Sequence, residues 1–232
     1  NKRTAGGREK VLDAGCGPGL FMAELIKKGY KVTGMDLSGE MLEIARNKVQ
    51  NANPNGPVRL VASDIETIPF RDDSIDILST AGVIEYLDND KNVLREFKRI
   101  LKHNGVLIIS VTNKFSYTLI LDNVYEYFRG KPFFFKIMNF ISVKIVGHGE
   151  LQPKTFKIRR HAPYAFRDLL IENGYEIIDS TFFYFTLLPH PFNQLLFQFG
   201  SWIGAKLEAL GKTKLGILGE GYLLICKNSK NR

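Results

Sequence analysis

The sequence predicts an α/β fold built on a doubly wound, mostly parallel β-sheet. Short apolar runs alternate with segments of helical period as far as Asn113, which is the pattern of successive strand–helix units. The run Val106–Val111 is apolar except for Ser110, as in a strand that is covered on both faces. With 232 residues, 44% of them hydrophobic, the chain can bury one core. We therefore expect a single domain over residues 1–232.

The first predicted strand, Lys10–Ala14, leads into a turn that is rich in glycine. Glycine stands at positions 15, 17 and 19, where it permits positive φ and a close approach of a ligand to the backbone. Apolar residues at helical spacing follow from Leu20, so the free N–H groups of a helix would face that ligand. A dinucleotide site would need its third glycine at position 20. The turn therefore predicts a phosphate- or nucleoside-binding site that is not of the dinucleotide kind, with an ordinary tight turn or an unrelated nucleotide site as the alternatives.

A carboxylate stands at or just after the end of each of the next two predicted strands. Lys31–Asp36 ends in Asp36, which lies 21 residues beyond Gly15 and could accept hydrogen bonds from both hydroxyls of a ribose. Ser38 supplies the N-cap of a helix that starts near Gly39, so Asp36 is not needed for that role. The strand Val58–Ala62 is followed by Ser63-Asp64-Ile65, in which Asp64 can also be explained as a turn residue.

The pattern Asp13-x-Gly15-x-Gly17-x-Gly19 resembles motif I of the class I S-adenosylmethionine-dependent methyltransferases, especially the branch acting on small molecules and quinone precursors. The block Ile68–Leu78 resembles the segment that leads into the family's fourth strand. The resemblance is close over residues 8–113. It implies a seven-stranded Rossmann-like sheet, S-adenosylmethionine as cofactor, and a last strand at Gly219–Lys227, antiparallel between the fifth and sixth.

The resemblance also implies a set of residues for the cofactor. Asp36 is expected on the ribose, Asp64 near the adenine amino group, and Ile65 against the adenine ring. Gly15 and Gly17 are expected against the amino-acid moiety. The full predicted set is Asp13, Gly15, Cys16, Gly17, Gly19, Asp36, Leu37, Met41, Ser63, Asp64, Ile65, Thr80 and Ala81.

The implied reaction is in-line methyl transfer to an oxygen or nitrogen nucleophile of a small or lipid-like hydrophobic acceptor. A general base is needed only if that nucleophile carries a proton, and the candidates are His161, His148, Tyr86 and Glu85. Some quinone methyltransferases hold a metal on Glu-x-x-Glu-His. Here Gly82 replaces the first Glu and Tyr86 replaces the His, so we predict that no metal is bound.

The segment after the fifth strand is unusually aromatic, because Phe115–Val146 holds nine of the 27 aromatic residues. Within it, Phe133–Ile145 is amphipathic at helical spacing. Three interpretations are open: a substrate lid over residues 115–150, a helix on a membrane surface, or a core or homodimer contact. A second helical cap is expected over residues 189–212, with the apolar face Phe192–Ile203.

The formal net charge of +8 suits nucleic acid, an anionic membrane or an anionic substrate. Ser79–Gly82 stands where many nucleic-acid methyltransferases carry an Asn-Pro-Pro-Tyr-like tetrapeptide, which disfavours a nucleic-acid or protein substrate. A non-catalytic cofactor-binding subunit is the other alternative. Cys16 and Cys226 are too few for a disulfide scaffold, so we expect a cytoplasmic protein, with peripheral membrane association if the aromatic segment meets lipid.

Overall fold

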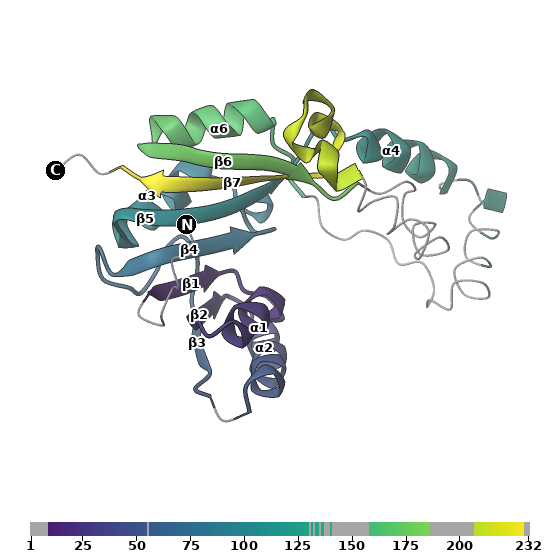
Figure 1. Ribbon diagram of the computed structural model, residues 1–232. Coiled ribbons are helices and arrows are strands. Elements are labelled where there is room, and N and C mark those ends of the chain that lie inside the picture. Colours follow the sequence, from purple (N-terminus) through teal and green to yellow (C-terminus); the bar gives the residue numbers. More distant parts are fainter. Residues whose placement is uncertain are drawn as a thin grey trace. The chain divides into compact units, whose positions relative to one another are not determined.

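The computed structural model describes residues 9–54, 56–129, 131, 133, 134, 136, 140, 158–185 and 207–229. Their strands form a seven-stranded sheet in the order β3-β2-β1-β4-β5-β7-β6 (Figure 1). The bounds are β1 Lys10–Ala14, β2 Lys31–Asp36, β3 Arg59–Ala62, β4 Ile75–Ala81, β5 Leu101–Thr112, β6 Tyr175–Phe183 and β7 Gly221–Asn228. This order confirms the predicted fold class.

Helices connect the strands. They are α1 Leu20–Lys27, α2 Gly39–Ala52, α3 Asp90–Ile100, α4 Tyr117–Arg129 and α6 Pro163–Glu172, with the 3₁₀ turns η1 Ile84–Tyr86, η3 Glu208–Lys212 and η4 Lys214–Leu218. The predicted cap of α2 is confirmed, because the Ser38 side chain accepts a hydrogen bond from the Met41 N–H at 3.3 Å. Pro163 opens α6, as its fixed φ favours.

The direction in which strands are added reverses at β1. From β1 the chain adds β2 and β3 on one side, then returns to place β4 on the other side, and β1 to β5 pair in parallel. Right-handed crossovers on the two sides put α1 and α2 on one face of the sheet and α3 on the other (Figure 1). In open sheets of this kind ligands bind at the carboxyl ends of the strands beside such a reversal.

Apolar side chains fill both faces of this sheet. On the face of α1 and α2, a buried cluster joins Val11, Met22, Val32, Leu42 and Val49. On α3, the residues Val93, Leu94, Phe97 and Ile100 are fully buried. The sheet is therefore a rigid base for groups at its carboxyl edge.

The start of β5 differs from what the sequence predicts, because the spacing of Val93, Phe97, Ile100 and Leu101 indicates a helix that includes Leu101 and stops at His103-Asn104-Gly105. The helix α3 ends at Ile100, and β5 begins at Leu101. Along β4 the pairing passes from Ile75↔Leu101 to Ile77↔Val106, so the residues between them bulge from the ladder. Asn104 adopts φ 63°, a conformation that asparagine tolerates and that lets the chain turn back into register.

Arg99 on α3 fixes the segment before β4. Its guanidinium donates to the carbonyls of Phe70 and Ile68 at 2.8 and 2.9 Å and pairs with Asp72 and Glu96, each at 2.8 Å. A planar guanidinium suits this because it donates in several fixed directions at once. The block that resembles the methyltransferase segment is thereby held against α3.

The chain divides into two compact units. Unit 1 comprises Asn1–Val111, Tyr164–Asp179 and Leu224–Arg232, and unit 2 comprises Thr112–Pro163 and Ser180–Leu223. The predicted insertions at 115–150 and 189–212 both fall in unit 2, where residues 141–157 and 186–206 lie outside the described residues. Most of the predicted helix Phe133–Ile145 and all of Phe192–Ile203 are thus not described. The single domain, the lid and the second cap stay predictions.

Within unit 2, Asn113 organises the chain after β5. Its side-chain amide donates to the carbonyls of Ile217 and Gly219 at 2.7 and 2.8 Å, and its side-chain oxygen accepts from the Phe115 N–H at 2.8 Å. A fully buried amide that makes these bonds is well satisfied.

None of the described helices is both long and apolar enough to cross a membrane.

Candidate cofactor site

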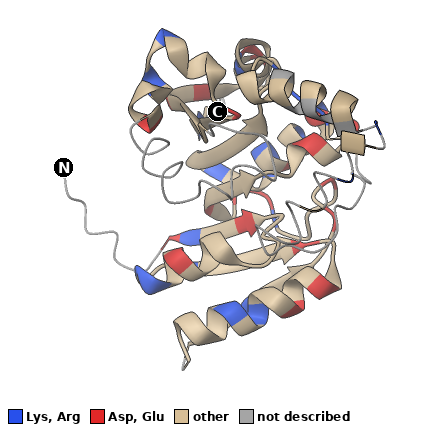
Figure 2. Cartoon of the chain, turned by 90° about the vertical axis from the view of Figure 1, so that its right-hand side faces the viewer, with Lys and Arg blue, Asp and Glu red and all other residues tan. Residues whose placement is uncertain are grey.

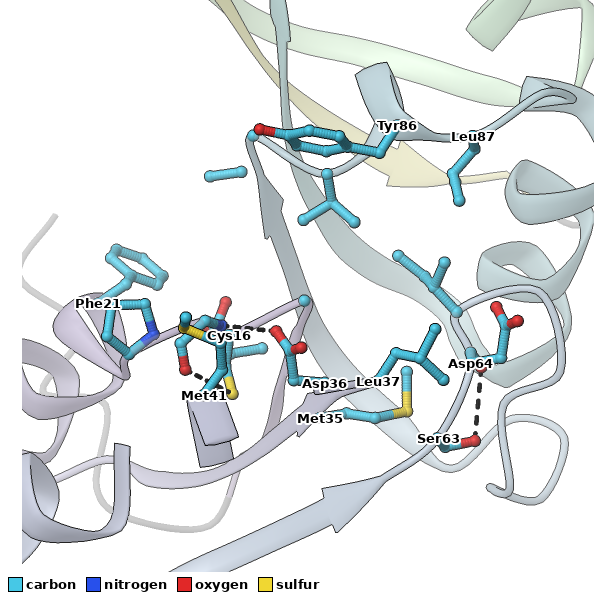
Figure 3. Close-up of a pocket in the computed structure, with 18 of the residues that line it drawn as sticks. Cys16, Phe21, Met35, Asp36, Leu37, Met41, Ser63, Asp64, Tyr86 and Leu87 are labelled. Carbon is cyan, nitrogen blue, oxygen red and sulfur yellow. Dashed lines mark hydrogen bonds between the residues drawn. The ribbon is translucent and has the colours of Figure 1, made fainter. Parts of the chain in front are cut away.

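A cavity of about 730 Å³ opens at the carboxyl ends of β1 to β4, wholly within unit 1. Figure 3 shows Asp36 between two groups of side chains, with Phe21, Cys16 and Met41 on one side and Ser63 and Asp64 on the other. The lining residues are Asp13, Gly15, Cys16, Gly17, Pro18, Leu20, Phe21, Met35, Asp36, Leu37, Met41, Ser63, Asp64, Ile65, Glu66, Ala81, Gly82, Val83, Tyr86 and Leu87. The volume is within the range of small-molecule sites.

The glycine turn forms one wall of the cavity. The N–H groups of Gly15 and Cys16 both donate to the Met35 carbonyl, at 2.7 and 2.9 Å. Gly15 has φ 73°, and a Cβ at this position would overlap the Val83 side chain. Gly17 also has positive φ, but a Cβ there would meet nothing within 4 Å. The backbone at Gly17 is therefore open to a ligand.

Asp36, at the end of β2, is positioned by two backbone donors. Its two side-chain oxygens accept one hydrogen bond each, from the Gly17 N–H at 2.8 Å and from the Ser38 N–H at 2.9 Å. A carboxylate oxygen has a second lone pair, so each oxygen can accept again. Asp36 thus joins the glycine turn to the cap of α2 and can still receive two hydroxyl groups.

Asp13, at the base of the cavity, is 4% exposed. Burial raises the pKa of its carboxyl from 3.8 to about 6, against the effect of a 2.7 Å hydrogen bond from the Ser79 hydroxyl and with a further increase from the negative charge of Asp36. Burial also raises the pKa of the Cys16 thiol to about 12. Cys16 is therefore a neutral wall residue rather than a nucleophile.

The cavity is acidic, although the whole chain is basic. Asp13, Asp36, Asp64 and Glu66 line it, and among its described lining residues there is no Lys, Arg or His. A nucleotide phosphate would meet carboxylates without a compensating cation, which is unfavourable. A nucleoside that carries positive charge and hydroxyl groups matches these walls. S-adenosylmethionine, with its sulfonium and ammonium groups, fits this description.

Comparisons with known proteins agree with this chemistry. A family model described as "Methyltransferase domain" matches residues 12–109. The chain is 30% identical over 206 residues to the uncharacterised protein MJ1252 of Methanocaldococcus jannaschii, covering 84% of this chain and 73% of that protein. The chain belongs to the class I S-adenosylmethionine-dependent methyltransferases. The resemblance drawn from the sequence is confirmed, and so is S-adenosylmethionine as the cofactor.

Other relatives are named methyltransferases. The chain is 31% identical over 115 residues to the "Sterol 4-C-methyltransferase strm-1" of Caenorhabditis elegans, covering 50% of this chain and 32% of that protein. It is 33% identical over 103 residues to the "Ubiquinone/menaquinone biosynthesis C-methyltransferase UbiE" of Geotalea daltonii, covering 43% and 44%. The chain thus spans less than half the length of either. An S-adenosylmethionine-dependent methyltransferase structure from Methanosarcina mazei superposes with a TM-score of 0.60 at 18% identity, covering 96% of this chain and 93% of that one.

The structure brings most of the predicted cofactor residues of this methyltransferase together. All of them line the cavity except Gly19 and Thr80. Gly19 is the N-cap of α1, where a Cβ would press on Ala45, and Thr80 is buried in β4. Asp64 is folded into a local turn, because its side chain accepts from the Glu66 N–H at 2.8 Å.

Several lining residues were not predicted from the sequence. They are Pro18, Leu20, Phe21, Met35, Glu66, Gly82, Val83 and Leu87. The exposure of Leu20 and Phe21, two apolar residues in the first turn of α1, is the kind of feature that an apolar pattern alone cannot reveal. Val83 could have been suspected only from its contact with Gly15, which requires the fold.

The candidate bases of the methyltransferase are dispersed. Tyr86 lines the cavity and is 58% exposed, and Figure 3 shows its ring across the cavity from Asp36. Glu85 is buried on η1 and does not line it. His161, in unit 2, bridges to Asn113 after β5, with its N–H donating to the Thr112 carbonyl at 2.8 Å. His148 lies outside the described residues.

No group of three or more potential metal-ligating side chains occurs in the described part of the chain. The argument against a bound metal still comes from the sequence, in which Gly82 and Tyr86 replace two ligands of the metal-binding pattern. Metal independence stays a prediction, which chelation can test.

Proposed function

We propose that this chain catalyses methyl transfer from S-adenosylmethionine to a small, hydrophobic or lipid-like acceptor. The observation that carries the proposal is the acidic cavity that Asp36 lines, where two backbone donors hold its carboxylate and each oxygen can accept a second hydrogen bond. The family membership supports the same reaction. Lys and Arg are interspersed with Asp and Glu over the described elements in Figure 2, which gives no support to a nucleic-acid substrate.

Each wall has a proposed partner on the cofactor. Asp36 would accept hydrogen bonds from the ribose hydroxyls, and Asp64 would receive the adenine amino group beside Ile65. The open backbone at Gly17, together with Gly15, would lie against the amino-acid moiety, with the Asp13 carboxylate below it. S-adenosylmethionine supplies a methyl group that is already activated on a positively charged sulfur.

The protein's remaining contribution is alignment and exclusion of water, which can account for much of the acceleration when the methyl donor is already activated. Tyr86 is the predicted acceptor-side residue that lines the cavity, so we propose that its hydroxyl orients the acceptor. Where the acceptor is a hydroxyl or a protonated amine, His161, His148 and Glu85 are the other candidates to receive the proton.

The acceptor class rests on the relatives' names as well as on the site. Two of them are named for sterol and for ubiquinone or menaquinone, which are hydrophobic molecules. Both are called C-methyltransferases, whereas we propose transfer to oxygen or nitrogen. Mass spectrometry of the product, with isotope-labelled methyl donor and sterol or quinone-precursor acceptors, would identify the methylated atom, and methylation at carbon would refute that part.

The test of the site itself is calorimetry with S-adenosylmethionine and S-adenosylhomocysteine. Loss of a charge-assisted acceptor costs about 1.5 to 3 kcal/mol, so Asp36→Ala should bind at least about tenfold more weakly. Asp76→Ala is the matched control, since Asp76 also accepts from a backbone N–H, that of Lys10 at 2.9 Å, but at the opposite end of β4. Unchanged affinity in folded Asp36→Ala would remove the assignment, and no binding by the wild type would remove the proposal.

A further inference from the structure

The helix α4 in unit 2 exposes an apolar surface, which we call the α4 face and define as Val124, Tyr127, Phe128 and Phe133. The first three are spaced as neighbours on one side of a helix, and Phe133 follows the end of α4. Tyr127 is 66% exposed and Phe133 is 79% exposed. Grouped exposed apolar residues of this size mark an interaction surface more often than chance.

Two rings of the α4 face contact each other, and one of them also contacts a ring beyond the helix. Tyr127 and Phe128 meet edge to face with 5.4 Å between ring centroids. The ring of Phe128 also lies 5.4 Å from that of Phe134, which extends the layer past the helix. Tyr127, Phe128 and Phe134 therefore form one group of contacting rings.

Lysines accompany these rings. Beside the α4 face, the Lys131 Nζ lies 5.4 Å from the centroid of the Tyr127 ring. Before the start of α4, the Lys114 Nζ lies 5.2 Å from the centroid of the exposed Phe115 ring. Among the described residues neither lysine forms an ion pair with a carboxylate. Lys136, between Phe134 and Phe140, is exposed as well. Basic residues therefore lie close to the exposed rings in both sequence and structure.

We propose that the α4 face docks onto an anionic lipid bilayer surface. Aromatic rings with ammonium groups beside them match the boundary where hydrocarbon meets anionic headgroups, and an apolar plus a basic signal together give stable attachment. The net charge of +8 favours the same surface over a neutral one. This inference rests on the proposed function, because a lipid-like acceptor would be met in a bilayer.

Vesicle flotation tests the inference with the whole protein. Vesicles of phosphatidylcholine with phosphatidylglycerol should carry the wild type at low salt, and phosphatidylcholine alone should carry much less. Lys131→Gln should weaken binding to the anionic vesicles about fivefold, and Tyr127→Ser should weaken it at low and high salt alike. The controls Lys91→Gln on α3 and Tyr164→Ser on α6, where Tyr164 is 53% exposed, should leave binding unchanged.

The failure of this inference can be told apart from failure of the proposed function. If the wild type does not float, or if the controls weaken binding as much as the α4 variants do, the docking surface is refuted. Concentration-dependent dimerisation that Tyr127→Ser abolishes, without vesicle binding, would refute it too and assign the face to a second copy. In each case calorimetry with S-adenosylmethionine reports on the cofactor site independently, because it needs neither vesicles nor an acceptor.

Discussion

Replacing Asp13 by asparagine should stabilise the protein without cofactor. Burial raises the pKa of this carboxyl from 3.8 to about 6, so the folded protein holds on to a proton that the unfolded chain releases. Stability therefore falls as the pH rises from about 4 to about 6. At about 1.4 kcal/mol per pKa unit, the buried carboxylate costs about 3 kcal/mol at neutral pH. The amide of the Asp13→Asn variant would keep an acceptor for the Ser79 hydroxyl and remove the charge.

The assay is urea unfolding of wild type and Asp13→Asn over a range of pH. The variant should be more stable by about 1 to 3 kcal/mol near neutral pH, with the gap about halved near pH 5 and nearly closed by about pH 3.5. The same variant should bind S-adenosylmethionine more weakly, because it lacks the negative charge under a cationic ligand. Asp13 would then be a residue that trades stability for binding.

The Asp76→Asn variant is a control, because it should change the unfolding free energy in the opposite direction. Burial pushes the pKa of Asp76 upward, but the hydrogen bonds from Lys102 and from the Lys10 N–H, with the charges of both lysines, outweigh it and hold the pKa below its ordinary value. Its stabilisation is present above the unfolded pKa and is lost as the pH falls through the folded pKa. Asp76→Asn should therefore lower stability near neutral pH. If Asp13→Asn did the same, or if its gain were independent of pH, the argument from burial would be refuted.

Two other predictions concern the cavity wall. Gly15→Ala should lose more than about 2 kcal/mol of unfolding free energy, because the added Cβ overlaps Val83 and the residue must also keep a positive φ. Gly17→Ala should lose about 1 to 2 kcal/mol, from the positive φ alone. Equal losses of the two variants in urea unfolding would contradict the packing argument. Methyl transfer should continue in EDTA, because Gly82 and Tyr86 replace two ligands of the metal-binding pattern, and a loss that magnesium restores would contradict it.

Sequence patterns predicted those strands and helices for which the local preference of the residues agrees with their packing in the fold. Lys31–Asp36 was predicted with the bounds that β2 has, because the turn at Gly29 ends the preceding helix and Ser38 caps the next one. Only a short run that contains the buried Val32 and Met35 is left between them. The predicted start of β5 was wrong because Leu101 suits the buried face of a helix or of a strand equally well. Only its pairing with Ile75 decides between them.

The residues of the candidate site also differ in whether the sequence could predict them. Asp36 and Gly17 could be predicted because their roles follow from residue type and spacing along one strand–turn–helix unit. The hydrogen bond between them could not be predicted, since it joins the ends of two strands. Val83 was missed for a related reason, because it meets Gly15 only through the pairing of β1 with β4. Phe21 was missed because an apolar pattern does not show that this side chain is left exposed beside the glycine turn.

Every described residue that lines the cofactor cavity belongs to unit 1, whereas the aromatic insertion belongs to unit 2. Changes in the insertion can therefore accumulate without removing any of the groups proposed to hold the methyl donor. Such a division favours the evolution of new specificities, because substitutions in unit 2 can change the acceptor while the residues proposed to bind the shared methyl donor stay unchanged. It also suggests a route for protein engineering, in which the segments of unit 2 are exchanged between relatives and binding of S-adenosylmethionine serves as the first test of each chimera.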